Sequence, residues 1–92
     1  MKSILQTEKC CYVCRGTYLL ESHHVFRGTA NRKKSEQYGL KVWLCRSHHT
    51  GPEGVHNNPS LDRKLKQLGQ QKFEETHSRK EFLREFGRNY QD

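Results

Sequence analysis

Apolar side chains recur with helical spacing in the last third of the chain. Leu61, Leu65 and Leu68 stand at positions i, i+4 and i+7, which places them on one face of an amphipathic helix. Asn58 is a favourable N-cap residue and Pro59 suits the first helical position. The pattern therefore predicts a helix that begins at Pro59.

A second helix is predicted further on by the signals at its two ends. Ser78 is followed three residues later by Glu81, the spacing of a capping box, and Gly87 is a suitable C-terminal cap. Phe82 and Phe86 lie four residues apart between these signals. We expect both rings, together with the leucines of the preceding helix, to face the core.

Two strands are predicted nearer the N-terminus. Residues 17–25 and 40–44 are short β-branched and aromatic stretches between turn residues, which favours a small antiparallel ribbon. The polar, basic segment between them, residues 27–39, is long enough for a loop with one helical turn closed by Gly39.

The whole chain, residues 1–92, is expected to form a single domain. It divides into a Cys/His-rich core, residues 10–58, and a helical tail, residues 59–92, that packs on that core. Only 32% of the residues are hydrophobic, and a chain this short buries about 60–65% of its unfolded surface. We therefore expect something besides an apolar core to stabilise the fold.

Membrane insertion and secretion are not expected. The apolar runs, such as residues 42–45, are far shorter than the about 20 residues that a membrane span needs. The first residues contain no apolar stretch typical of a signal peptide. These features predict a cytoplasmic protein, in which disulfides are disfavoured.

The net charge of +7 predicts a polyanionic partner, most often nucleic acid. Residues 1–58 carry nine basic and four acidic side chains, whereas residues 59–92 carry eight and six. The first part is therefore the expected phosphate-facing surface. The alternative is that the excess charge only keeps the protein in solution.

Four residues have the spacing of a zinc site. Cys11 and Cys14 form a C-x2-C knuckle, and Cys45 and His48 supply a C-x2-H pair about thirty residues later. A structural Zn²⁺ can contribute on the order of 10 kcal/mol to folding, which is the stabilisation that so small a core lacks. Cys10 could replace Cys11 through C-x3-C spacing, or it is a free thiol beside the knuckle.

The histidines exceed what one zinc site needs. Five of the six fall in one half of the chain: His23, His24, His48, His49 and His56. Two adjacent His-His pairs are hard to explain by packing alone, so we expect a second metal site. Because neighbouring strand residues point to opposite faces, His23 and His24 can serve one site only where the strand ends. His77 lies outside this group.

The core resembles the HNH endonucleases, which have a ββα-metal (His-Me finger) fold. The segments that carry the resemblance are Cys11–Cys14, Glu21–Val25, Trp43–Cys45, His48–His49 and His56. The closer likeness is to small phage-type HNH proteins akin to the Ref recombination-enhancement nucleases. It implies an α+β fold, a zinc-stabilised ββα-metal module followed by C-terminal helices.

The resemblance also implies a role for each histidine. His23 and His49 would bind a catalytic divalent metal, and His24 would be the general base that activates water. His56 matches the last histidine of the family pattern, as a third ligand or a phosphate contact. The implied activity is hydrolysis of phosphodiester bonds in DNA, in phage recombination or DNA processing in the cytoplasm of a bacterial or phage-infected host cell, leaving 5′-phosphate ends.

Two departures from the family pattern bear on these expectations. The middle Asn of the family normally precedes the second strand, where this chain has residues 39–41, so the residue that orients His24 is unassigned. Asn31 does not match the motif position. Pro52 interrupts any helix that starts near Ser47, so the helix of the ββα unit should be short or displaced.

The ligand set and the basic residues give two further expectations. The predicted catalytic site holds no carboxylate, so we expect Mn²⁺, Co²⁺ or Ni²⁺ to support activity better than Mg²⁺, with Zn²⁺ as a further candidate. The candidates for phosphate contacts are Arg27, Arg32, Lys33, Lys34 and Arg46. None forms a base-reading signature, so strict sequence recognition is not expected.

Two other functions remain open from the sequence. One is a non-catalytic zinc module that holds DNA or RNA through the same basic surface, with all histidines structural. The other is a small phage protein that binds another protein, such as a recombinase, through the tail helices. A homodimer is also open, since one active centre per chain cuts one strand.

Overall fold

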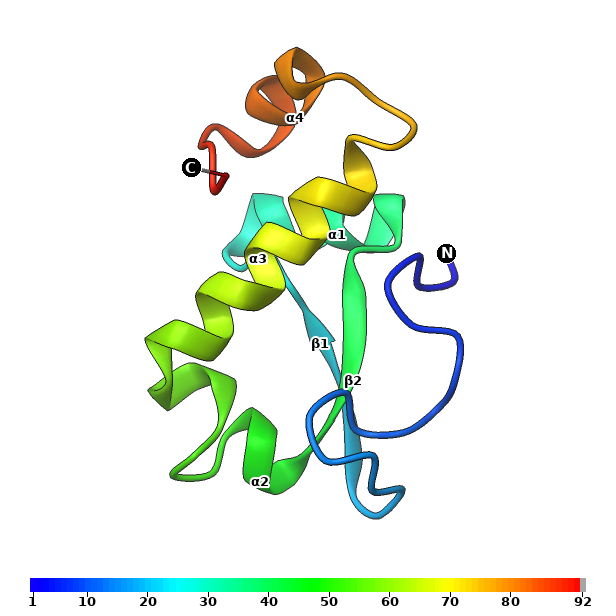
Figure 1. The fold of residues 1–92 in the computed structure, drawn as a ribbon, viewed down its shortest axis with the longest axis vertical. Coiled ribbons are helices and arrows are strands. Elements are labelled where there is room, and N and C mark those ends of the chain that lie inside the picture. Colours follow the sequence, from blue (N-terminus) through cyan, green and yellow to red (C-terminus); the bar gives the residue numbers. More distant parts are fainter. Residues whose placement is uncertain (92) are drawn as a thin grey trace.

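The computed structural model describes residues 1–91. Within them, two strands form an antiparallel ribbon, and four α-helices and a short 3-10 turn surround it (Figure 1). In chain order the elements are β1 (Leu20–His24), α1 (Thr29–Tyr38), β2 (Lys41–Cys45), α2 (Arg46–His49), the 3-10 turn η1 (Val55–Asn57), α3 (Pro59–Phe73) and α4 (Arg79–Phe86). No helix in this part of the chain is long and apolar enough to cross a membrane.

The ribbon confirms the predicted antiparallel pair. Its register places His23 opposite Val42 and Ser22 opposite Trp43. Because strand side chains alternate, His23 and Val42 lie on the inner, buried face, and Ser22 and Trp43 lie on the outer face. The first strand is shorter than predicted. Leu19, with a φ of 53°, is in the left-handed region, which interrupts extended backbone before Leu20.

Helix α1 corrects the prediction of one helical turn in a loop. The segment forms a ten-residue helix that ends at Gly39, whose φ of 71° is the left-handed conformation of a C-terminal cap. The buried hydroxyl of Ser35 accepts a hydrogen bond from the backbone N–H of Phe26 and donates one to its carbonyl. This tertiary anchor, rather than an apolar stripe, fixes the helix against the end of β1.

Both helices of the tail are as predicted. The Asn58 side chain accepts a hydrogen bond from the Leu61 N–H at the start of α3. Ser78 and Glu81 form the capping box of α4, and Gly87 ends it with a φ of 75°. These ends rest on interactions between neighbouring residues, which is why the sequence sufficed to predict them.

The tail helices pack around the ring of Phe26, just after β1. Its centroid lies 5.4 Å from that of Phe82 and 4.6 Å from that of Phe86. Gly69 permits the close approach of α3 to the same ring, since a Cβ at that position would lie only 3.0 Å from Cε2 of Phe26. The tail thus lies against the element that carries the paired histidines.

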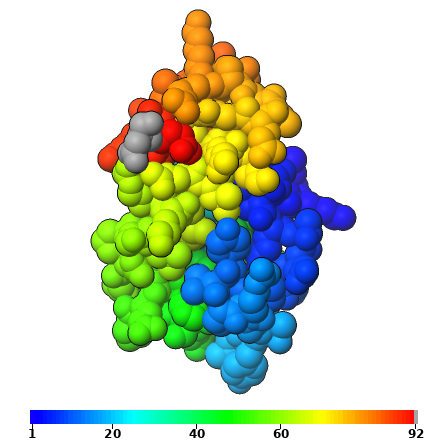
Figure 2. Space-filling view, viewed as in Figure 1, coloured from blue at the N-terminus to red at the C-terminus, as the bar shows by residue number. Residues whose placement is uncertain are grey.

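The N-terminal segment covers the open edge of β2. Gln6 Oε1 accepts a hydrogen bond of 2.8 Å from the Trp43 N–H, and the Tyr12 N–H donates one of 2.8 Å to the Trp43 carbonyl. The Ile4 N–H donates to the Gly39 carbonyl. These bonds satisfy edge groups that would otherwise be unpaired. In the space-filling view the segment forms a continuous blue flank beside the green part of the chain (Figure 2).

Candidate metal centres

Three cysteines and one histidine meet where β2 passes into α2. Cys45 is the last residue of β2, His48 lies in α2, and Cys11 and Cys14 reach them from the loop before β1. One ligand atom from each lies within 4.8 Å of the others. Cys45 Sγ is 3.2 Å from His48 Nδ1 and 3.8 Å from Cys14 Sγ. The four side chains are close enough to hold a metal ion, consistent with the predicted structural zinc.

A tight turn brings the two knuckle cysteines together. The Arg15 N–H donates to the Cys11 carbonyl, and the Cys11 N–H donates to the Gly16 carbonyl. Arg15 takes up the left-handed conformation, with a φ of 67°. Cys10 is buried beside this turn but lies outside the cluster. Of the two spacings considered, the structure therefore assembles the one that uses Cys11.

The Cys11 thiol is poised to lose its proton. Burial raises its pKa, but hydrogen bonds from the backbone around Cys45, Cys14 and Val13 outweigh burial and lower the pKa to about 6. Zinc binds cysteine as the thiolate. The backbone thus favours the protonation state that metal binding requires.

Three imidazoles form a second cluster. His23 comes from β1, His49 from α2 and His56 from η1, and one ring nitrogen from each lies within 4.8 Å of the others. The ring centroids are 5.2 Å apart for His23 and His49, and 4.9 Å apart for His49 and His56. The structure therefore brings together the three predicted ligands of the second site, from segments far apart in the sequence.

His23 carries the clearest sign that the cluster suits a metal ion. Its side chain is 2% exposed, and its Nε2 has no hydrogen-bond partner among the described residues. Burial, followed by the neighbouring His49 and His56, lowers its pKa to about 3, so the imidazole is neutral near pH 7. A buried, neutral ring nitrogen without a partner is costly, and a bound divalent ion would satisfy it.

The other two imidazoles are held by side chains that were not predicted to contact them. Glu21 Oε1 lies 2.8 Å from His49 Nδ1. If Nδ1 donates its proton there, Nε2 of His49 keeps a free lone pair for a metal. Arg27 donates to His56 Nδ1 over 2.6 Å and lies 3.5 Å from a carboxylate oxygen of Asp62. Because Nε2 of the neutral ring then carries the proton, a metal bound to His56 would take the place of Arg27 at Nδ1. Burial, and next Arg27, lower the pKa of His56.

His24 stands apart from this cluster and has a different partner. Its Nε2 lies 2.9 Å from Oε1 of Glu36 on α1, and the other Glu36 oxygen lies 2.7 Å from Lys41 Nζ. Hydrogen bonds from Lys41 and then from His24 lower the pKa of Glu36 to about 2. Glu36 is therefore a carboxylate at any working pH, fixed against one nitrogen of His24.

An open cavity of about 350 Å³ is lined both by the three clustered histidines and by His24. Its lining residues come from β1, α1, α2, η1 and the turn after β1: Ser22, His23, His24, Arg27, Gly28, Arg32, His49 and His56. Since β1 ends at His24, the adjacent His23 and His24 both reach it, as the sequence analysis required. A phosphate group in this cavity would meet imidazoles and two guanidinium groups.

The predicted phosphate-binding residues lie in three different places. Arg27 and Arg32 line the cavity. Lys33 and Arg46 are exposed elsewhere. Lys34 points to α4 instead, where its Nζ donates to the Glu85 carbonyl over 2.5 Å and lies 3.6 Å from the Glu85 carboxylate.

The missed carboxylates differ in how far the sequence could have revealed them. Glu21 stands two residues before His23, so strand alternation places both on one face. Glu36 and Asp62 reach their partners only through the tertiary fold.

No protein-family model, curated protein or solved structure matches this chain.

Proposed function

We propose that this protein is a metal-dependent endonuclease of the HNH type that hydrolyses phosphodiester bonds in DNA, with RNA as a further substrate to be tested. One observation carries the proposal: three imidazoles converge around the unpartnered, buried Nε2 of His23, and His24 opens onto the same cavity. The sequence resemblance, which rests in part on the same histidines, also supports the proposal and favours a role in phage recombination or DNA processing.

The order of the elements supports a ββα-metal arrangement. In that interpretation β1 and β2 are the two strands and α2 is the helix, and His49 of α2 faces His23 of β1 across the cluster. The helix is four residues long, in keeping with the effect expected from Pro52. Helix α1 is then an insertion between the two strands.

The second cluster would hold the catalytic ion through His23, His49 and His56. Imidazole ligands without a carboxylate suit Mn²⁺, Co²⁺, Ni²⁺ or Zn²⁺ better than Mg²⁺. A divalent ion bound there would supply Lewis-acid stabilisation of the charge on the phosphate and on the leaving oxygen. The first cluster would hold a structural Zn²⁺ that joins the knuckle to the ribbon.

The chain's own residues provide the base and its orientation. If His24 donates from Nε2 to Glu36, its Nδ1 keeps a lone pair that can accept the proton of an attacking water. Glu36 would then do what the middle Asn does in the family, which is to hold the base in one orientation. Arg27 and Arg32 would bind the phosphate at the cavity.

A plasmid-nicking experiment tests the proposal. Supercoiled plasmid is incubated with zinc-loaded wild type, with His24→Ala and with the control His77→Phe, each with Mg²⁺, Mn²⁺, Co²⁺ or Ni²⁺. His77 is a suitable control because it stacks on Phe73, away from both clusters, and phenylalanine preserves the stacking. Metal analysis first establishes that all three proteins retain zinc.

We expect nicking by wild type and by the control, and loss of nicking by about a hundredfold or more in His24→Ala, because general-base catalysis typically contributes that much. If the folded wild-type protein does not cut the plasmid with any of the four metals, the endonuclease proposal fails. Binding of DNA without cutting would then favour the non-catalytic zinc module.

A further inference from the structure

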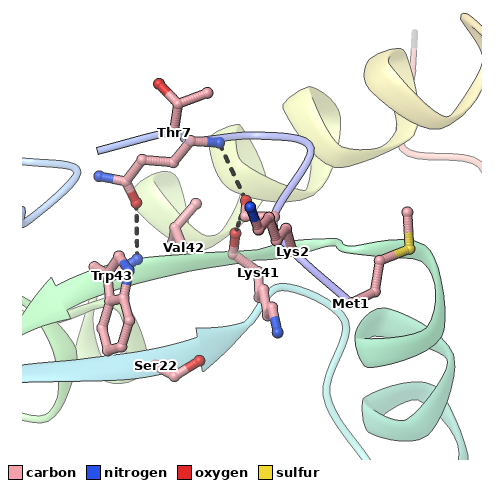
Figure 3. A pocket seen from close by; sticks show the side chains of 9 residues that line it. Met1, Lys2, Thr7, Ser22, Lys41, Val42 and Trp43 are labelled. Atoms are coloured by element: carbon pink, nitrogen blue, oxygen red, sulfur yellow. Dashed lines mark hydrogen bonds between the residues drawn. The ribbon is translucent and has the colours of Figure 1, made fainter. Parts of the chain in front are cut away.

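Another cavity lies on the outer face of the ribbon, away from the three-histidine cluster. It has a volume of about 760 Å³ and is enclosed by the N-terminal segment, Ser22 of β1 and residues 41–43 of β2 (Figure 3). The hydrogen bonds of the N-terminal segment to β2 fix its walls. The mechanism above assigns no role to this cavity.

Trp43 supplies an aromatic surface in the cavity. It is the chain's one tryptophan and lies on the outer face, beside Ser22 of the neighbouring strand. Figure 3 shows its ring at the cavity below β2. The ring is half-buried, although a tryptophan that served only as packing would be expected on the inner face. A partly exposed indole that lines a cavity is suited to stacking.

The charge around this ring favours an anionic ligand. Lys2 lines the cavity, and Lys9 Nζ lies 4.7 Å from the centroid of the Trp43 ring. Lys41 also lines the cavity, but its Nζ is paired with Glu36 over 2.7 Å. No acidic side chain is among the described lining residues. Aromatic surfaces with lysines around them are typical of sites that bind a nucleic-acid strand.

The cavity shares one lining residue with the proposed active site. Ser22 lines both cavities, and the next cross-strand pair on the outer face is His24 with Lys41. Two strand residues span about 7 Å. A nucleic-acid strand with a phosphate beside His24 would therefore extend naturally along the ribbon towards Trp43.

We propose, on the basis of the function proposed above, that this cavity binds an unpaired nucleobase of the substrate strand, stacked on Trp43 with Lys2 and Lys9 at the neighbouring phosphates. The ring face is accessible only to a base that is not held in a duplex. Base–aromatic stacking is stronger than an exposed cation–π contact, so a base can displace Lys9 from the ring. The substrate is then single-stranded DNA or RNA, or a duplex with an unpaired segment.

Trp43 fluorescence tests this directly, because no other tryptophan contributes to the signal. Zinc-loaded protein without added catalytic metal is titrated with an oligothymidylate of about twelve nucleotides, and with an abasic oligomer of the same length and charge. We expect the oligothymidylate, but not the abasic strand, to quench the emission. Equal binding of both strands without a change in Trp43 emission would overturn the proposal.

Variants test the stacking by a second readout, the anisotropy of a labelled oligothymidylate. Trp43→Leu should weaken binding by roughly five- to a hundredfold, and Trp43→Phe should weaken it less, because stacking is partly retained. Tyr18→Leu is the matched control, since Tyr18 is 80% exposed and does not line the cavity. Zinc content and thermal unfolding establish that each variant is folded. Equal loss of affinity in Tyr18→Leu and Trp43→Leu would also overturn the proposal.

The binding and nicking experiments can fail separately. If plasmid is cut in a His24-dependent manner but oligothymidylate does not quench Trp43, the base-binding cavity is wrong and the nuclease stands. If oligothymidylate quenches Trp43 but no metal supports cutting, the nuclease is wrong. Base binding by a non-catalytic module then remains.

Discussion

Glu21 and His49 are joined across two elements by a distance of 2.8 Å between Oε1 and Nδ1. Glu21 lies on β1, two residues before His23, and His49 lies on the short helix α2. The contact couples the position of α2 to the ribbon. It also favours the tautomer of His49 in which Nε2 has a free lone pair. A carboxylate that accepts the other ring N–H is a usual partner of a metal-binding histidine.

Replacement of Glu21 by glutamine should weaken metal binding at the second cluster. The loss of a carboxylate that orients a histidine ligand typically costs ten- to a hundredfold in metal affinity, and we expect about that loss for Mn²⁺ or Ni²⁺. Calorimetric titration of zinc-loaded protein measures it. Glu53→Gln is the matched control, because Glu53 is exposed and lies outside this cluster. Equal affinities of the two variants would contradict the role of Glu21.

The two adjacent cysteines should differ sharply in their effect on zinc. Cys11→Ser should lose tightly bound zinc and unfold at a much lower temperature, because Cys11 belongs to the four-residue cluster. Cys10→Ser should keep zinc, because Cys10 is buried outside that cluster. Metal analysis and thermal unfolding by circular dichroism measure both effects. Retention of zinc by Cys11→Ser, with loss in Cys10→Ser, would show that the C-x3-C spacing is used instead.

The sequence predicted those parts of the fold that rest on local interactions. The caps of α3 and α4 involve residues within three positions of each other, and both were correct. Helix α1 was underestimated because its anchor, Ser35, contacts Phe26 only in the folded chain. The limit of β1 was missed because nothing in the sequence marks Leu19 as left-handed.

The candidate site shows the same division. Paired spacings predicted the cluster of three cysteines and His48, and the doubled histidines predicted the second cluster. The acidic partners depend on which surfaces meet in the tertiary structure, as with Glu36 of α1 and His24 of β1. Among the basic residues, charge alone could not separate Arg32, at the cavity, from Lys34, which contacts α4.

Glu36→Gln should lower the cutting rate with little effect on DNA affinity. The variant keeps the size of the side chain but loses the carboxylate that faces His24 Nε2. Because the pKa of Glu36 is lowered to about 2, the wild-type group is ionised throughout the working pH range, and its contribution should not vary with pH. We expect a fall in kcat of about tenfold or more, with KM nearly unchanged.

Glu75→Gln is the control for this experiment. Glu75 lies in the turn after α3, where it pairs with Lys72 outside the cavity. It should therefore leave both kinetic parameters unchanged. An increase in KM without a change in kcat in Glu36→Gln would mean that Glu36 affects substrate binding and does not orient the base.

The buried His23 should make stability depend on pH in the absence of a catalytic metal. Its pKa is about 3 in the fold, owing first to burial, and about 6.5 in the unfolded chain. Between these values only the unfolded chain takes up a proton at this residue. The free energy of unfolding is therefore highest, as far as His23 is concerned, above pH 6.5, and it falls as the pH falls towards 3.

His23→Phe should remove this dependence. Between pH 6.5 and 5.5, wild type should lose about 1 kcal/mol of unfolding free energy relative to the variant. Denaturant unfolding at both pH values measures the difference, with zinc content checked at each, because a zinc ion held by the first cluster would also be released in acid. Parallel pH profiles for the two proteins would show that His23 is not held neutral by the fold.

Substitutions of Arg32 and Lys34 should have different effects, the first on nucleic-acid binding and the second on stability. Arg32 is exposed at the cavity, so Arg32→Met should weaken DNA binding and reduce the dependence of log affinity on log salt by about one phosphate contact. Lys34 donates to the Glu85 carbonyl, so Lys34→Met should lower the melting temperature by about 4–8 °C, as expected for the loss of about 1 kcal/mol, with the salt dependence unchanged. Each variant is the other's control, since both remove one positive charge. Equal changes in the salt dependence would mean that net charge, and not the position of Arg32 at the cavity, determines binding.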